Sequence, residues 1–182
     1  MILPRGSLGF CAMILMLAWY RLELCLFFLL CVFVHELGHL IALKFRNVPI
    51  YGFYLRLSGA VIEAGEMSNG TEFICVLAGP VFSLLFGAFI LKICPECGLI
   101  SICLGVINLL PMLPLDGGKM LHAILSMYFT TDLVNLILHI CAFIVSGALM
   151  IGACWAAIWL QAGMWPIFAA LVLLWRSGDM EK

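Results

Sequence analysis

The sequence predicts an all-α polytopic membrane protein with about six transmembrane helices and a short β-hairpin between the second and third helices. Of its 182 residues, 65% are hydrophobic and only 10% are charged. A soluble domain averages roughly 45–50% apolar and about 25% charged residues. So few polar side chains cannot cover a globular core in water, and we expect the lipid bilayer to be the solvent. The net charge of -1 gives no indication of a nucleic-acid partner.

Six apolar runs account for the predicted helices. A transmembrane helix needs roughly 20 apolar residues, and fewer where other helices shelter it. The runs cover residues 8–20, 24–43, 73–93, 99–113, 133–152 and 154–175. The first run follows Arg5 but is not followed by a small-residue cleavage site, which favours a membrane segment over a signal peptide. The boundary near Gly152 is only weakly polar, so counts of five or seven spans stay open.

The predicted hairpin lies between the second and third runs, in residues 45–72. The stretch 48–63 is rich in β-branched and aromatic residues and is interrupted by Gly52 and Gly59. This pattern indicates one or two short strands. Extended backbone near a membrane must be shielded by protein or water. We therefore expect the hairpin to cover the mouth of a polar cavity.

The distribution of Lys and Arg predicts the orientation. With six spans, Arg21 and Lys92 fall on one side, and the other side carries Arg5, Lys44, Arg46, Arg56, Lys119, Arg176 and Lys182. Positive residues are concentrated in cytoplasmic loops. Both termini are therefore expected in the cytoplasm.

A five-residue motif in the second run, His35-Glu36-Leu37-Gly38-His39, carries the chemistry. Helical residues four apart lie on one face about 6 Å apart along the axis, so both imidazoles can bind one zinc ion. Glu36 is rotated by about 100° and can act as a general base without being a ligand. The alternative is a histidine pair that only hydrogen-bonds neighbouring helices. Three ionisable side chains in lipid cost several kcal/mol without partners, which favours the metal.

The best candidate for a third ligand is Asp116, after the fourth run. Zinc hydrolases use three protein ligands and keep one position open. Pro111 and Pro114 prevent regular helical hydrogen bonding and are expected to turn Asp116 inward. A compatible role for Asp116 is the N-cap of a helix that begins near Gly117.

Most of the nine cysteines lie in apolar runs and are expected to pack as small hydrophobic residues. Cys94-Pro-Glu-Cys97 has a spacing that suggests metal or redox chemistry. A simple turn between two spans is the alternative, and the role of this pair stays open.

These motifs resemble the site-2 protease family of intramembrane zinc metalloproteases, and the layout is most similar to the branch of the stage IV sporulation factor B protease. The resemblance rests on His35-Glu36-x-x-His39 and on the segment from Asn108 through the two prolines to Asp116-Gly117. It implies that His35, His39 and Asp116 hold Zn²⁺ and that Glu36 activates the attacking water. It further implies that Asn108 lines the site, where it positions the substrate or stabilises the oxyanion.

The resemblance also implies the organisation and the partners. Residues 1–182 would form a single membrane-embedded metalloprotease domain with the HExxH span at 24–44, the β-rich loop at 45–72 and the Asn-Pro-Asp-Gly-containing span at 99–118, without a PDZ or CBS domain. The expected partners in a bacterial plasma membrane are the lipid bilayer and a membrane-tethered substrate, such as a pro-sigma factor or another regulator. An inhibitory membrane protein and a second copy of the chain are further partners that it implies.

The chain departs from the family at one position, because Gly79-Pro80-x-x-Ser83 has serine where the family often has asparagine. Two other functions stay open. A zinc or proton-coupled transporter would use the same buried ionisable groups, but no inverted repeat is evident. A catalytically silent family member could serve as a membrane-bound partner. The residues do not identify the substrate, its cleavage site, the oligomeric state or the regulation.

Overall fold

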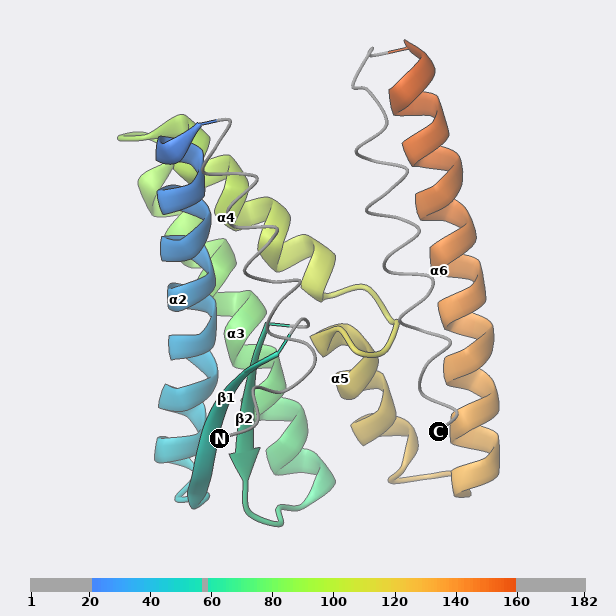
Figure 1. Cartoon of the computed structure of the whole chain (residues 1–182). Helices are drawn as coiled ribbons and strands as arrows, with labels where there is room; N and C mark the ends of the chain where they lie inside the picture. The colour runs from blue at the N-terminus through green and yellow to red at the C-terminus, as the bar shows by residue number, and fades with distance from the viewer. Residues whose placement is uncertain (1–20, 57–58, 160–182) are drawn as a thin grey trace, which may run out of the picture. The chain divides into compact units, whose positions relative to one another are not determined.

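The computed structural model describes residues 21–56 and 59–159 (Figure 1). The predicted first span, 8–20, and residues 160–175 of the predicted sixth span lie outside the described part. The chain divides into two compact units, Met1–Leu109 and Leu110–Lys182, which are described in turn.

In the described part of the first unit, three helices pack against one another in every pairing. They are α2 (Leu22–Phe45), α3 (Asn69–Ile90) and α4 (Pro95–Asn108), which correspond to the predicted second, third and fourth spans. Ser68 caps α3, because its hydroxyl oxygen accepts a hydrogen bond from the backbone N–H of Thr71. Pro95 opens α4, where its missing N–H costs nothing.

Glycines allow close contacts between these helices, while many large apolar side chains are exposed. A Cβ at Gly38 on α2 would lie 2.7 Å from the Ala78 carbonyl on α3, and one at Gly87 on α3 would lie 2.7 Å from Ile102 on α4. In contrast, Phe33 is 64% exposed and Leu85 is 66% exposed. Helices in lipid associate in this way because moving apolar surface out of lipid gives no free energy. Close packing of the backbones does stabilise the association, through van der Waals contacts.

Length and composition suit these helices to a membrane. Among the described helices, three are long and apolar enough to cross it: Leu22–Phe45, Asn69–Ile90 and Thr131–Trp155. The apolar helix Pro95–Asn108 is shorter, as predicted for a span sheltered by its neighbours.

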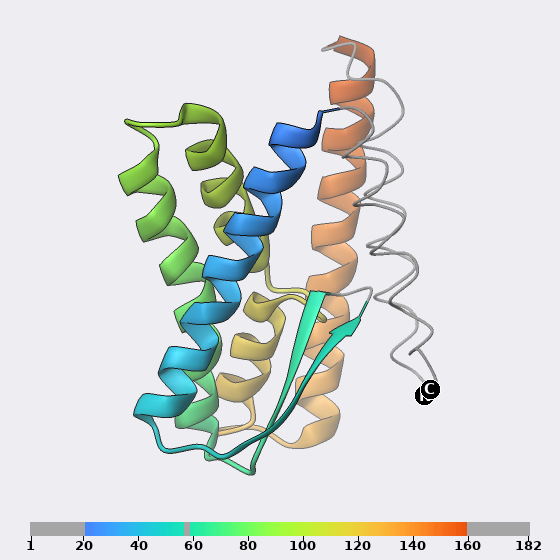
Figure 2. The ribbon, with the colours of Figure 1, turned by 60° about the vertical axis from the view of Figure 1, so that its left-hand side comes forward.

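The predicted hairpin is confirmed. Strands β1 (Ile50–Arg56) and β2 (Gly59–Ala64) pair antiparallel, with Tyr54 opposite Val61 and an irregularity between Ile50 and Gly52. Figure 2 shows the two strands running as one twisted ribbon after α2. Because the sheet has only these two strands in the described residues, β1 has one edge that β2 does not pair.

A tight helix end directs the chain from α2 into β1. The N–H of Val48 donates to the Leu43 carbonyl, and the N–H of Asn47 donates to the Lys44 carbonyl. Asn47 has a φ of 55°, the left-handed conformation that this Schellman end requires and that asparagine tolerates better than most residues. The local sequence therefore fixes where α2 stops.

The second unit contains α5 (Asp116–Leu125) and α6 (Thr131–Trp159), which contact each other. The non-helical stretch before α5 contains Pro111 and Pro114, as predicted. The prediction that Asp116 is the N-cap of this helix is wrong by one residue. Leu115 is the N-cap and Asp116 is the first helical residue, so its side chain does not cap the helix.

A second correction concerns the boundary predicted near Gly152, because α6 continues without a break to Trp159. Glycine costs a helix roughly 1 kcal/mol relative to alanine but keeps its N–H and adds no steric clash. In an apolar environment without proline, this cost is too small to end a helix.

We expect Gly87→Ala to destabilise the protein by about 1–3 kcal/mol, because a new methyl group would push α3 away from α4. Thermal unfolding in detergent micelles measures this change. The matched control is Gly147→Ala on α6, where a Cβ would have no described residue within 4 Å, so the change should be neutral or slightly stabilising. Equal loss of stability in both variants would contradict the packing described here.

Candidate metal centre

The two histidines of the predicted motif point at each other from successive turns of α2. Their ring centroids lie 5.0 Å apart with an angle of 81° between the rings. The Nε2 atoms of His35 and His39 are 3.3 Å apart. His35 is buried and His39 is half-buried. The predicted arrangement of two imidazoles on one helix face is therefore present.

A buried hydroxyl group orients His35. Its Nδ1 lies 2.8 Å from the hydroxyl oxygen of Ser83 on α3. Ser83 is held in turn, because the Ser101 hydroxyl on α4 donates to the Ser83 carbonyl at 2.8 Å. Both serines are fully buried. The position of the His35 ring thus depends on α2, α3 and α4 together.

A backbone carbonyl orients His39. The Nδ1 of His39 lies 2.9 Å from the Cys75 carbonyl oxygen on α3. A carbonyl can only accept, so Nδ1 carries the proton and the Nε2 of the neutral ring keeps its lone pair. This is the tautomer that a metal ligand needs, with its second nitrogen bound to an acceptor.

Gly79 on α3 provides the space in front of the two rings. A Cβ at this position would overlap Nε2 of His39 and would lie 2.9 Å from Nε2 of His35. Any side chain here would displace the imidazoles, so glycine is required by close approach.

The geometry of the pair fits zinc. Two nitrogen ligands at about 2.0–2.1 Å from one tetrahedral Zn²⁺ lie roughly 3.3 Å apart. The observed separation of the Nε2 atoms is 3.3 Å. Both rings also have their Nδ1 atoms engaged by hydrogen-bond partners, as metal-binding imidazoles almost always do.

Glu36 directly follows His35 in α2 and is half-buried. Carboxylates inside membrane-spanning helices are rare because they are costly to desolvate, and they usually face a protein interior or a water-filled cavity.

The second unit holds Asp116 at the start of α5. Its carboxyl group is buried, and its Oδ1 accepts a hydrogen bond from Nζ of Lys119 at 3.1 Å. A Cβ at Gly118 would overlap the backbone of Met112 and Leu113. The chain from Met112 to Gly118 therefore folds tightly back on itself and fixes the direction in which α5 starts.

Asn108 is the last residue of α4 and is half-buried. Its Nδ2 donates to the carbonyl of Leu104 in the preceding turn at 3.0 Å. This bond occupies one amide proton within α4, and the predicted role toward substrate stays a prediction.

Sequence reasoning missed two contacts. Ser83 was recognised only as a departure from the asparagine of related sequences, although a hydroxyl in an apolar helix signals a need for a partner. Lys119 was counted only as a cytoplasmic charge, although its spacing of three residues from Asp116 is typical of an ion pair on a helix.

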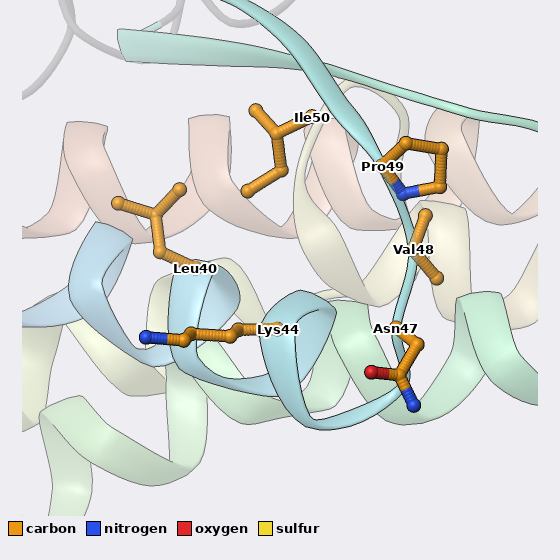
Figure 3. A pocket seen from close by; sticks show the side chains of 6 residues that line it. All are labelled: Leu40, Lys44, Asn47, Val48, Pro49 and Ile50. Carbon is orange, nitrogen blue, oxygen red and sulfur yellow. The ribbon is translucent and has the colours of Figure 1, made fainter.

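A cavity of about 490 Å³ lies near the end of α2 (Figure 3). It is lined by Leu40 and Lys44 of α2 and by the chain from Asn47 to Ile50, which leads into β1. The cavity is thus bordered by the helix that carries the histidines and by the strand that follows it.

Comparison with known proteins identifies the family. The model of peptidase family M50 matches residues 90–153, which include Asn108, the two prolines and Asp116. The stage IV sporulation protein FB of Bacillus subtilis (strain 168) is 31% identical over 171 residues, or 82% of this chain. The chain therefore carries a peptidase M50 (site-2 protease) domain and is a homologue of the sporulation protein.

Other members and a solved structure agree with this assignment. A zinc metalloprotease of Methanocaldococcus jannaschii is 32% identical over 108 residues, which is 52% of this chain and 32% of that protein. The site-2 protease structure from the same organism has a TM-score of 0.69 at 24% identity, with 95% of this chain and 86% of that chain covered. At this identity the likeness shows the fold alone.

The chain spans about half the length of the sporulation protein, 56%, and smaller shares of other curated site-2 protease relatives.

We expect Ser83→Ala to lower zinc affinity roughly 10–100-fold, because removing a partner of a ligating imidazole typically has this effect. Zinc competition with a chromophoric chelator, on the purified protein, measures the change. Ser146→Ala is the matched control, since it removes another buried hydroxyl from an apolar helix, one that donates to Phe143. Ser83→Asn should retain more zinc than Ser83→Ala, and unchanged affinity in Ser83→Ala would contradict the orienting role.

Proposed function

We propose that this chain is an intramembrane zinc metalloprotease that hydrolyses peptide bonds of membrane-associated proteins within or near the bilayer. The observation that carries the proposal is the 3.3 Å separation of two oriented imidazole nitrogens on a helix long and apolar enough to span a membrane. Zinc supports hydrolysis in soluble enzymes with the same two-histidine helix.

The proposed ligands are His35, His39 and Asp116, each of which offers one atom that can bind a metal ion. Asp116 is proposed as a ligand because it occupies the corresponding position of the family motif, and the burial of its carboxylate supports this assignment. Two imidazoles and one carboxylate make a donor set typical of catalytic zinc, with one position left for water or substrate. On this proposal the two units act together as one metalloprotease domain over residues 1–182.

When bound there, zinc supplies Lewis acidity that polarises the scissile carbonyl and lowers the pKa of the attacking water. Glu36 accepts the proton that this water loses as its oxygen attacks the carbonyl carbon. The same carboxyl group then gives the proton to the amide nitrogen as the C–N bond breaks, which regenerates the base. Asn108 lies on the substrate side, where a side-chain amide can orient the peptide or stabilise the developing oxyanion.

The site is proposed to lie inside the membrane near its cytoplasmic face. His39 precedes Lys44 by five residues, which is roughly 8 Å along a helix axis. Beyond Lys44, the guanidinium of Arg46 donates to the hydroxyl of Thr71 at the polar start of α3, which supports a membrane boundary here. Because Lys and Arg are concentrated on this side in the sequence, we propose that both termini lie in the cytoplasm of a bacterial cell.

The substrate is proposed to be a membrane-tethered regulator. The name of the sporulation relative supports a role in bacterial development. A pro-sigma factor is proposed as one such substrate from the resemblance of the motifs alone. An inhibitory membrane protein and a second copy of the chain are proposed as further partners.

An extended substrate segment would fit beside β1. Peptide bonds in a helix are shielded by their own hydrogen bonds, so a substrate must unwind before cleavage. The unpaired edge of β1 could pair with such a segment by β-augmentation. The apolar side chains of Leu40 and Ile50 border the adjacent cavity and could receive its side chains.

Replacing residues 50–64 by a flexible Gly-Ser linker is expected to abolish cleavage of a helical substrate while zinc content stays near one ion per chain. The reason is that the linker removes the strand edge but none of the proposed ligands. Cleavage and bound zinc are measured on the same preparation. Undiminished cleavage after the replacement would eliminate the strand-pairing hypothesis.

The proposed chemistry is tested by Glu36→Gln, which keeps the shape of the side chain but removes its basicity. We expect normal zinc content and a loss of cleavage of roughly 10²–10⁴-fold, the usual contribution of a general base. The assay co-expresses a single-pass substrate and separates its products by electrophoresis. Glu23→Gln is the control, since Glu23 is exposed in the first turn of the same helix. Equal cleavage by wild type and Glu36→Gln would refute the role of Glu36.

A further inference from the structure

A second cluster of reactive side chains lies one helical turn before the histidine pair. The thiols of Cys31 on α2 and Cys97 on α4 are 3.9 Å apart, and the Cys31 thiol also donates to the Cys97 carbonyl at 3.5 Å. Cys31 is 0% exposed and Cys97 is 2% exposed. Neither the proposed hydrolysis nor the family motif uses them.

The third member of the cluster is Cys94, which gives the buried pair a route to water. Cys94 is the N-cap of α4 and is half-buried, whereas Cys97 lies one turn further along the helix. The neighbouring residues Lys92 and Glu96 are exposed. The motif therefore has one thiol at the surface and one thiol facing Cys31.

We propose that Cys31, Cys94 and Cys97 form a thiol–disulfide exchange site that takes a low-molecular-weight disulfide, such as oxidised glutathione, and ends as a Cys31–Cys97 disulfide joining α2 to α4. A Cys-x-x-Cys motif that begins at a helix N-terminus is the arrangement used by disulfide oxidoreductases. The proposed orientation places Lys92 and Cys94 outside the cytoplasm, where disulfides persist.

The exchange proceeds in three balanced steps. The thiolate of Cys94 attacks the small disulfide, forms a mixed disulfide and releases one small thiol. Cys97 then attacks the Cys94 sulfur and releases the second small thiol. Finally Cys31 attacks the Cys97 sulfur, and Cys94 leaves and takes up the proton from Cys31. Two protein thiols are oxidised, and one small disulfide is reduced to two thiols.

The geometry suits the last step. The two sulfur atoms must approach from 3.9 Å to about 2.05 Å, a movement that side-chain rotation and a small shift of the packed helices can supply. A zinc site is the competing use of two adjacent thiols. Within the described residues, the cysteine pair is not part of any group of three potential ligands, so a closed zinc site would lack ligands.

The disulfide would act on the metal centre through a short chain of contacts. Cys31 precedes His35 by one turn, and Ser101, one turn after Cys97, donates to the carbonyl of Ser83. Ser83 in turn orients His35. Drawing α2 and α4 together at this point disturbs that chain, so oxidation should slow cleavage reversibly. This consequence rests on the proposed protease function, whereas formation of the disulfide does not.

The test exposes the full chain in membranes to oxidised glutathione, alkylates free thiols and identifies cross-linked peptides by mass spectrometry. We expect the loss of two alkylation adducts and a Cys31–Cys97 peptide that dithiothreitol removes. Cys31→Ser should instead accumulate the Cys94–Cys97 disulfide. Cys94→Ser should slow the cross-link, and Cys103→Ser, which changes an exposed thiol of the same helix, should leave it unchanged.

Three results would overturn the proposal. One is that the thiols of Cys31 and Cys97 are both still alkylated when the reagent is added after oxidation. Another is that the wild-type protein accumulates the Cys94–Cys97 disulfide and forms no Cys31–Cys97 disulfide. The third is that a chelator, and no reductant, releases the thiols, which would indicate a metal site. Cleavage is measured on the same samples. If the disulfide forms while cleavage is absent before and after reduction, the proposed protease function fails and the exchange site stands.

Discussion

Two imidazole rings in the middle of an apolar helix impose the constraint on which the rest of the structure depends. In lipid, each ring nitrogen without a partner costs several kcal/mol, so every one must be satisfied by protein or by a metal. The structure meets this need with the hydroxyl of Ser83 and the carbonyl of Cys75, both from α3. With the Nδ1 atoms bound in this way, the two Nε2 atoms lie 3.3 Å apart.

This arrangement requires helices that approach unusually closely. Gly38 allows α2 to touch α3, and Gly79 leaves the volume that the two rings occupy. A larger side chain at either glycine would hold the helices apart, and many of the large apolar side chains lie on the exposed faces. The same choice of small residues therefore serves both packing in lipid and the geometry of the proposed site.

The sequence predicted the parts of this structure that depend on local chemistry. The spacing of His35 and His39 sets their separation through helix geometry alone, and the glycines and β-branched residues after α2 predicted the hairpin. Pro111 and Pro114 predicted the non-helical stretch before α5, because proline removes a helical hydrogen bond. Features that depend on packing were beyond reach. The contact of Ser83 with His35 joins residues that are distant in the chain. Gly152 was a different case, because the small free-energy cost of glycine in a helix does not end α6 there.

The central claim is that His35, His39 and Asp116 bind one zinc ion. X-ray absorption at the zinc edge, on wild type and Asp116→Ala loaded with one equivalent of zinc, tests it most directly. For wild type we expect two imidazole nitrogens and oxygen ligands at about 2.0–2.2 Å, with the oxygen shell altered in the variant. Sulfur at about 2.3 Å in wild type, or identical spectra for the two proteins, would contradict the assignment.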